Sequence, residues 1–426
     1  MFNYSDVIED HLIERLLKSN DEHIPIIITS GDCACEDLEK YVKDLGGIIR
    51  HRLHIINAIA AYIPPTNVKS LSNESFVSKV HLDDIVMKLM DKASITVAAD
   101  FANEYGFTGK GVGVAIIDTG VYPHRDLTTP SNRIVKFVDF INKKTSPYDD
   151  DGHGTHVAGI VAGNGFSSNG KYMGIAPDAN IVAIKVLDEN GGGNVSDVIA
   201  GIQWAIENKS RYNIKILTLS LGIKAKSSYK DDPLCKAVAQ ASKRGITVVV
   251  AAGNSGPDAS TISSPGISPD VISVGACNDR EVSNPKDCPV ADFSSRGPTI
   301  DNINKPDILA PGVNIKSLNN KNNDYASLSG TSMAAPIVAG CAALLYEENP
   351  NFTHDKIKER IKEASTDLGS DTNTQGAGLL DLKKLINGSK VPKEGRDNKN
   401  HETTNSSPGY NNFLLIAIIV LLILRM

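Results

Sequence analysis

The stretch Gly330-Thr331-Ser332-Met333-Ala334-Ala335-Pro336 opens a long apolar helical pattern, and three other short motifs precede it. In chain order these are Ile116-Ile117-Asp118-Thr119-Gly120, Asp151-Gly152-His153-Gly154-Thr155-His156 and Ala251-Ala252-Gly253-Asn254-Ser255-Gly256. Each motif stands where an apolar run ends or a helical pattern begins, and α/β folds build their sites at such joints. The four motifs therefore place an aspartate, a histidine, an asparagine amide and a serine in this order along the chain.

The region that carries these motifs alternates between two patterns from Val112 onward. Apolar β-rich runs cover residues 112–117, 180–186, 214–220, 246–252 and 271–276, and helical patterns cover residues 154–163, 195–208, 233–243, 332–347 and 354–364. Strands that are apolar on both faces and separated by helices are typical of a parallel sheet between helix layers. The sequence predicts an α/β fold with a mostly parallel sheet.

The chain outside this region predicts three further parts. Helical patterns at residues 6–19, 36–45 and 66–71 alternate with strand patterns at residues 24–29, 48–53, 55–63 and 76–80. From residue 24 on this is the β-α-β-β-α-β order of a small ferredoxin-like α+β domain. We expect domains at residues 1–90 and 91–387, a disordered polar linker at residues 388–412, and a hydrophobic tail at residues 413–426.

Composition excludes some classes of protein. A 426-residue chain with 41% hydrophobic residues can bury a large core, and a net charge of -6 gives no footprint for nucleic acid. The six cysteines are scattered, and no C-x-x-C pair occurs. We expect free thiols in a reducing compartment, although Cys277 and Cys288 flank a polar insertion and could be bridged.

The two termini bear on location. No basic segment followed by an apolar core opens the chain, so no secretory signal is visible. Phe413 to Leu424 is unbroken and apolar but spans only about 18 Å as a helix, against roughly 30 Å of hydrocarbon. We favour membrane attachment over a docked or oligomerising tail. The basic residues Lys390, Lys393, Arg396 and Lys399 precede it, which predicts a cytoplasmic, membrane-tethered protein.

The four motifs together suggest nucleophilic catalysis. A serine hydroxyl needs an adjacent base, and that base needs a carboxylate to orient it. Asp118 ends a predicted strand, His153 begins a helix, and Ser332 begins another. The Ser332 backbone N–H and the Asn254 amide could stabilise an oxyanion. Each motif alone has an ordinary structural explanation, such as a helix cap, and only the ordered set favours chemistry.

In these motifs the chain resembles the subtilisin-like serine proteases (subtilases, peptidase family S8) from about Phe107 to Leu382. The resemblance implies a three-layer subtilisin-like fold and a serine endopeptidase that works through an acyl-enzyme. It also implies Asp118 as the orienting carboxylate, His153 as general base and acid, and Ser332 as nucleophile. Asn254 resembles the family's oxyanion amide. His156 is then a helix residue without a role in proton transfer.

The resemblance extends, less specifically, to substrate binding and inhibition. Ser220-Leu221-Gly222 resembles the edge segment that binds an extended polypeptide substrate as an added strand, with Ala252 and Gly253 lining the pocket before the scissile bond. The N-terminal domain resembles the family's propeptide, an intramolecular inhibitor. Residues near 81–95 would then thread the active site and be cut by the enzyme itself. The alternative is a permanently attached accessory domain.

Two questions stay open at this level. Asp126 matches a carboxylate that helps to hold a structural calcium ion in relatives, but the loop Gly163 to Met173 contains a lysine and no carboxylate. The chemistry itself requires no cofactor. A non-catalytic homologue that only binds peptide or a partner protein is the alternative function, and the complete set of Asp118, His153 and Ser332 favours the enzyme. No H-E-x-x-H zinc motif or G-x-S-x-G elbow occurs.

Overall fold

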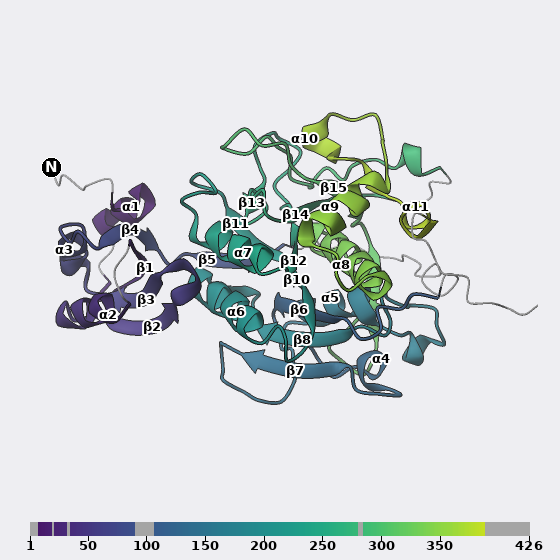
Figure 1. Ribbon diagram of the computed structural model, residues 1–426, viewed down its shortest axis with the longest axis horizontal. Coiled ribbons are helices and arrows are strands. Elements are labelled where there is room, and N and C mark those ends of the chain that lie inside the picture. The colour runs from purple at the N-terminus through teal and green to yellow at the C-terminus, as the bar shows by residue number, and fades with distance from the viewer. Residues whose placement is uncertain (1–6, 19–20, 32–34, 90–105, 280–283, 388–426) are drawn as a thin grey trace, which may run out of the picture. The chain divides into compact units, whose positions relative to one another are not determined.

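The computed structural model describes residues 7–18, 21–31, 35–89, 106–279 and 284–387 (Figure 1). The chain divides into one compact unit, Met1–Ser389, and a second unit, Lys390–Met426. The predicted linker and tail lie outside the described residues. Within those residues, no helix has both the length and the apolar character needed to cross a membrane.

The N-terminal part is a four-stranded antiparallel sheet, with strand order β2-β3-β1-β4, packed on three helices. Its elements are α1 (Asp10–Lys18), β1 (Ile24–Ser30), α2 (Cys35–Asp44), β2 (Ile48–Leu53), β3 (Ala58–Ile63), α3 (Val68–Leu71) and β4 (Val77–Leu82). The predicted strand at residues 55–63 is shorter than expected. A 3-10 turn, η1 (His54–Ile56), and the left-handed Asn57 interrupt it before Ala58.

The two faces of this sheet pack against different neighbours. Alternate residues of a strand point to opposite faces. Ile26 and Ile28 of β1 pack in a core with the three N-terminal helices, whereas Ile27 packs in a core with the helices of the following domain. The N-terminal sheet is therefore covered on its second face by the rest of the unit.

The large sheet has nine strands in the order β18-β19-β15-β14-β12-β10-β6-β8-β7, and every neighbouring pair except β18–β19 is parallel. Its strands are β6 (Gly113–Asp118), β7 (Ile134–Asp139), β8 (Asn180–Lys185), β10 (Ile214–Leu219), β12 (Thr247–Ala251), β14 (Ile272–Cys277), β15 (Ile308–Pro311), β18 (Ser365–Thr366) and β19 (Leu379–Leu380). The five predicted apolar runs are the central strands, and no run predicts β7, β15, β18 or β19.

Helices cover both faces of the large sheet, which gives three layers (Figure 1). One layer contains α5 (His153–Ala162), α8 (Thr331–Glu348) and α9 (His354–Glu363), and the other contains α6 (Val195–Glu207) and α7 (Pro233–Lys243). Alternate residues of β6 pack against opposite layers: Ile116 faces the first and Ile117 the second. The predicted three-layer α/β fold is confirmed.

Shorter elements complete the unit. They are β5 (Ile85–Lys88), α4 (Arg125–Thr128), β9 (Gly192–Asn194), β11 (Leu221–Lys224), β13 (Ser263–Ser264), β16 (Ile315–Leu318), β17 (Tyr325–Leu328), α10 (Thr372–Gln375), α11 (Leu382–Asn387), and the 3-10 turns η2 (Pro65–Asn67), η4 (Phe166–Ser168) and η5 (Pro285–Asp287). Cys235, Cys277, Cys288 and Cys341 are buried free thiols, as expected. Cys33 and the side chain of Cys35 lie outside the described residues.

Candidate active site

Asp118 and His153 form a buried pair at the carboxyl edge of the large sheet. Asp118 is the last residue of β6 and His153 the first of α5. The Asp118 Oδ1 lies 2.7 Å from the His153 Nδ1 and also accepts the Thr119 backbone N–H at 2.8 Å. Because this bond holds the His153 imidazole through Nδ1, the other ring nitrogen, Nε2, is left to bind another group. Among the described residues, Nε2 has no hydrogen-bond partner.

The glycine that follows His153 allows α5 to start this close to β6. A Cβ at Gly154 would lie 2.1 Å from the Gly120 carbonyl oxygen, so any larger residue would push the helix away. The Gly154 N–H donates to Thr119 Oγ1 at 2.9 Å, and Thr155 donates to Asp149 through both its N–H and its hydroxyl. The residues around His153 therefore hold the imidazole in place.

His156 lies on the same helix but in a different environment. Its Nε2 is 3.0 Å from the Ile315 carbonyl oxygen and 3.1 Å from that of Ala326. Burial, and secondly the neighbouring His153, lower the pKa of His156 to about 3. A ring that is neutral and donates to two carbonyls anchors β16 and β17 to α5, which is a structural task.

Ser332 is the second residue of α8 and is fully buried. Its hydroxyl donates to the Ser220 carbonyl oxygen at 2.9 Å, and the Ser220 hydroxyl donates to the Ser332 carbonyl oxygen at 3.0 Å. The structure thus joins Asp118 to His153 directly, while the Ser332 hydroxyl is bonded to Ser220 instead of His153. Hydrogen bonds of this kind often align only once substrate is bound.

Asn254 is oriented by the residue before Ser332. Its side-chain oxygen accepts the Thr331 backbone N–H at 3.0 Å and the Thr331 hydroxyl at 2.9 Å. The Asn254 Nδ2 is buried and has no partner among the described residues, so it can donate to a developing charge. No sequence pattern predicts this role of Thr331, whose place directly before a candidate nucleophile is the only signal.

The predicted substrate edge carries an added strand that comes from the chain itself. β5 pairs antiparallel with β11, so that Met87 lies opposite Gly222 and Lys88 opposite Leu221. The next residue, Leu89, donates its N–H to the Ser220 carbonyl oxygen at 3.2 Å. That is the same carbonyl oxygen that accepts the Ser332 hydroxyl. β5 therefore ends beside Ser332.

Glycine at residue 222 leaves room for the Leu89 side chain. A Cβ built at Gly222 would stand 3.2 Å from the Leu89 Cδ1. Ala252 is buried in a cluster with Cys235, Ile262 and Ile267. Gly253 adopts a φ of +119°, and a Cβ there would meet the Ser263 hydroxyl oxygen at 2.5 Å. Gly222 is thus the predicted residue that closely approaches Leu89.

Asp126, the candidate calcium ligand, is occupied by protein donors. One carboxylate oxygen accepts the Ser167 N–H at 2.8 Å and the other accepts the Tyr325 hydroxyl at 2.6 Å. Calcium needs six or more oxygen ligands. The described residues contain no group of three or more histidine, cysteine or acidic side chains that could hold a metal. Both carboxylate oxygens of Asp126 are thus already hydrogen-bonded to protein donors.

The N-terminal sheet is bound to α6 through charged side chains that belong to no motif in the sequence. The register of β2 against β3 shifts between Ile49 and His51, which makes Arg50 an extra, bulged residue. A bulge re-aims side chains. As a result Arg50 and His51 both contact Asp197, at 3.0 and 2.7 Å. Burial alone would raise the pKa of Asp197, but His51 and Arg50 hold that pKa below its usual value.

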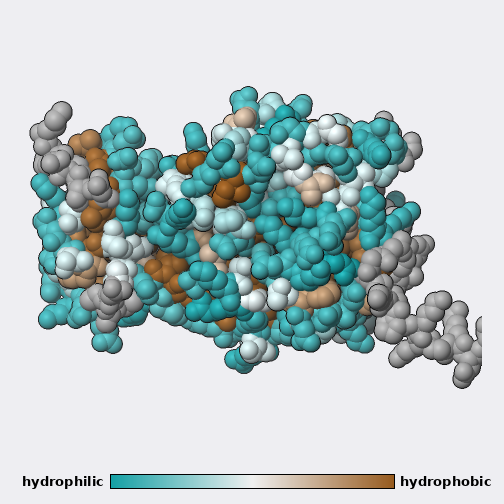
Figure 2. All heavy atoms as spheres, turned by 45° about the horizontal axis from the view of Figure 1, so that its top comes forward, coloured by the Kyte–Doolittle hydropathy of each residue, from teal (hydrophilic) through white to brown (hydrophobic). Residues whose placement is uncertain are grey.

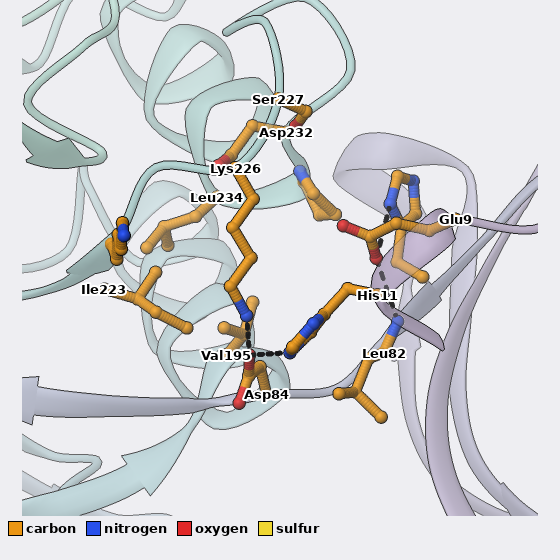
Figure 3. Close-up of a pocket in the computed structure, with 13 residues that line it drawn as sticks. Glu9, His11, Leu82, Asp84, Val195, Ile223, Lys226, Ser227, Asp232 and Leu234 are labelled. Carbon is orange, nitrogen blue, oxygen red and sulfur yellow. Dashed lines mark hydrogen bonds and ion pairs between the residues drawn. The ribbon is translucent and has the colours of Figure 1, made fainter. Parts of the chain in front are cut away.

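A second set of contacts lies at the rim of this interface. Figure 3 shows Lys226 and His11 converging on Asp84, which they approach to 2.6 and 3.4 Å. Glu9, on the N-terminal side of the same pocket, accepts the Leu82 N–H at 3.2 Å. These ion pairs are partly exposed, whereas the Asp197 carboxylate is nearly buried. The pocket is lined by residues of both the N-terminal part and the catalytic part, and it contains none of the candidate catalytic residues.

An aspartate-bound imidazole with an unpartnered Nε2, a serine at a helix N-terminus and an unpartnered amide donor are the parts of a serine hydrolase. Comparison with known proteins identifies which kind. Residues 109–379 match the subtilase family, peptidase S8, and the chain belongs to that family.

The chain is similar to several curated proteases over most of its length. It is 44% identical over 368 residues to serine protease AprX of Bacillus subtilis (strain 168), covering 81% of this chain and 83% of that protein. It is 36% identical over 333 residues to an alkaline protease of Alkalihalobacillus alcalophilus, covering 78% and 79%. It is 34% identical over 347 residues to subtilisin E of Bacillus subtilis, covering 80% and 84%. The protein is a subtilisin-like serine endopeptidase.

Proposed function

We propose that this endopeptidase is made as a zymogen whose N-terminal domain occupies the active site until the enzyme cuts it away. The observation that carries the proposal is the bond from the Leu89 N–H to the Ser220 carbonyl oxygen, 3.2 Å long, at the residue that also binds the Ser332 hydroxyl. A chain that lies along β11 as an added strand is bound in the way a polypeptide substrate would be.

In the proposed mechanism, Ser332 attacks the peptide carbonyl carbon while His153 takes the hydroxyl proton through Nε2. Asp118, bonded to Nδ1 at 2.7 Å, stabilises the imidazolium that forms. The Ser332 backbone N–H and the Asn254 Nδ2 stabilise the tetrahedral oxyanion. His153 then protonates the departing amine, and water repeats the sequence on the acyl-enzyme.

The zymogen proposal also requires that β5 be held firmly. The bulged pair Arg50 and His51 on Asp197, together with the apolar face of the N-terminal sheet, supports such a hold. Asp83, just before β5, accepts the Ser196 N–H at 2.9 Å and its hydroxyl at 2.6 Å at the start of α6. A propeptide bound through these contacts remains an inhibitor after the chain has been cut.

The test is to incubate the purified full chain and its Ser332→Ala variant, and then to treat both with a fluorophosphonate probe. We expect the wild type to be cut first after Leu89, to react with the probe on Ser332 and to hydrolyse casein. The variant should do none of these. A variant that is processed normally on its own would contradict self-cleavage, and a probe adduct on another residue would contradict the nucleophile.

We also propose that Asp126 fastens the loop at Ser167 to Tyr325 and holds no calcium. Its two oxygens already accept hydrogen bonds of 2.8 and 2.6 Å. We expect the thermal midpoint of the Ser332→Ala chain to be the same with excess chelator as with added calcium. A rise of several degrees with calcium that Asp126→Asn abolishes would restore the metal site.

For location we propose a cytoplasmic enzyme attached to membrane by the tail at residues 413–424. The apolar run and the four basic residues before it support this proposal. Fractionation of the intact chain and of a chain that ends at residue 412 is the test. The intact chain should sediment with membranes and the shortened one should not. An intact chain wholly in the supernatant would contradict the attachment.

A further inference from the structure

We propose that Asp151 selects a lysine or arginine in the substrate, at the residue one position before the residue that donates the scissile carbonyl. The inference rests on the proposed function and adds a substrate class to it. Lys88 marks the position, because the next residue, Leu89, binds the Ser220 carbonyl beside Ser332. The Lys88 ammonium group forms an ion pair with the Asp151 carboxylate.

The pair is largely removed from water. The Lys88 side chain is 18% exposed and that of Asp151 is 9% exposed. An ion pair in such surroundings is screened less than one on an open surface. The backbone supports the same placement, because the Lys88 N–H donates to the Gly191 carbonyl oxygen at 3.0 Å. A cation at this position is therefore bound at both its main chain and its side chain.

Gly191 lies directly against the alkyl stem of this lysine. A Cβ at Gly191 would lie 2.4 to 2.7 Å from the Lys88 Cγ, Cδ and Cε atoms, and its φ is +77°. Any other residue would therefore be strained there and would also displace the stem. Long basic side chains bury their methylenes and extend the charge beyond them. Gly191 leaves room for such a stem, and the Asp151 carboxylate binds the charge at its end.

The orientation of Asp151 is fixed by the active site itself. Its other oxygen accepts the His153 backbone N–H at 3.0 Å, at the start of α5. The adjacent Asp150 is committed elsewhere, because it lies 2.6 Å from the ammonium of the buried Lys185. Of these two neighbouring aspartates, Asp151 is the one that contacts β5.

Asp151 and Gly191 both belong to the catalytic domain. They stay in place when the N-terminal domain leaves, and a substrate strand then enters along β11 and β9 as β5 does. The two residues that hold Lys88 in the zymogen are thus available to substrates. Arginine should also fit, since its planar guanidinium pairs well with a carboxylate.

The experiment compares two fluorogenic peptides with the sequences Val-Met-Lys-Leu and Val-Met-norleucine-Leu before the leaving group. Norleucine keeps the alkyl stem and removes the charge. We expect the fully converted wild type to show a kcat/KM about tenfold higher for the lysine peptide, as a charge-assisted contact implies. Added salt should reduce this ratio.

Asp151→Asn should bring the ratio close to one, while Asp150→Asn, its matched control, should leave it near the wild-type ratio. Equal cleavage of both peptides by the wild type, or an unchanged ratio in Asp151→Asn, would overturn the inference and leave the endopeptidase standing. Failure of the wild type to cleave either peptide or to react with a fluorophosphonate would overturn the proposed function instead.

Discussion

The strands β6 and β2 place their polar residues in opposite ways. All six residues of β6 are buried between two helix layers, and its only charged residue, Asp118, is the last one. β2 has three basic or imidazole side chains in its interior and one fully buried residue, Leu53. A sheet covered on both faces can offer a polar group only at its edge, whereas a partly open sheet can use its face. Chemistry therefore sits at strand ends in one region, and recognition sits on a strand face in the other.

The largest effect should come from the end of β6. Asp118→Asn should lower the rate at which the full chain converts itself by about four orders of magnitude, because the imidazole loses the carboxylate that fixes its tautomer. Conversion is followed on a denaturing gel. Asp126→Asn is the matched control, a second buried aspartate beyond the same strand, and should change the rate by no more than a few-fold. Similar losses in both variants would mean that Asp118 acts through stability alone.

The next effect concerns the edge donor after β12. Asn254→Ala should reduce turnover by about 10²–10³-fold, because the lost Nδ2 donor acts in the transition state. It should also lower the unfolding temperature, because the Thr331 N–H and hydroxyl lose their acceptor. Thr331→Val removes the hydroxyl that orients the Asn254 amide and keeps the backbone donor. We expect a smaller loss for it, about tenfold. Steady-state hydrolysis of a peptide by each converted variant provides the comparison, and intact turnover in Asn254→Ala would refute the oxyanion role.

The face of β2 should control release of the N-terminal domain and not the chemistry. Asp197→Asn should shorten the delay between cleavage on the gel and the appearance of peptidase activity by about tenfold, because Arg50 loses a nearly buried partner. Lys226→Met, which breaks the partly exposed pair with Asp84 shown in Figure 3, should shorten it much less. If both variants behave alike, the bulge at Arg50 is not the main hold.

The smallest effect is one of acid stability. Burial lowers the pKa of His354 to about 4, so the unfolded chain binds a proton that the folded chain excludes as the pH falls below 6.5. This should cost about 1 kcal/mol of stability between about pH 7 and pH 5.5. His354→Leu in the Ser332→Ala chain should remove that loss in urea unfolding. His54→Leu, an exposed histidine before β3, should keep it; an unchanged pH slope in His354→Leu would contradict the assignment.

Much of the large sheet could be predicted because its strands are continuous apolar runs. The helix at residues 233–243 and the ends of β6 and β8 agree with the sequence patterns to within a residue. β7 was missed since it is an edge strand with exposed and half-buried positions, including Val135 and Lys136. Edge strands carry a weaker apolar signal than central ones. The start of β3 was misjudged because Asn57 turns left-handed in a run of otherwise strand-forming residues.

The sequence predicts site residues that lie in ordered motifs. It does not predict residues whose role depends on a contact between distant segments. The pairing of Lys88 with Asp151 joins positions 63 apart in the chain. Asp151 belongs to a quoted motif, but nothing in that motif indicates Lys88 as its partner. The direction of the Arg50 side chain depends on a register shift between β2 and β3, which the pattern of either strand alone does not show. Thr331 was inside a quoted motif, but its bond to Asn254 depends on two elements meeting in space. Local sequence patterns do not show which residues, far apart in the chain, contact each other in the fold.

Figure 2 shows a mostly hydrophilic surface with scattered hydrophobic patches on the face drawn, whereas Asp118, His153 and Ser332 are buried. Thr331 donates two hydrogen bonds to the Asn254 side-chain oxygen and directly precedes Ser332 in the chain. The same residue therefore positions both the nucleophile and the oxyanion donor. A helix that begins at Thr331, moved into a different protease, would bring Ser332 and Thr331 but not Asn254. In chimaeras of related proteases, Asn254 and Thr331 should therefore come from the same parent.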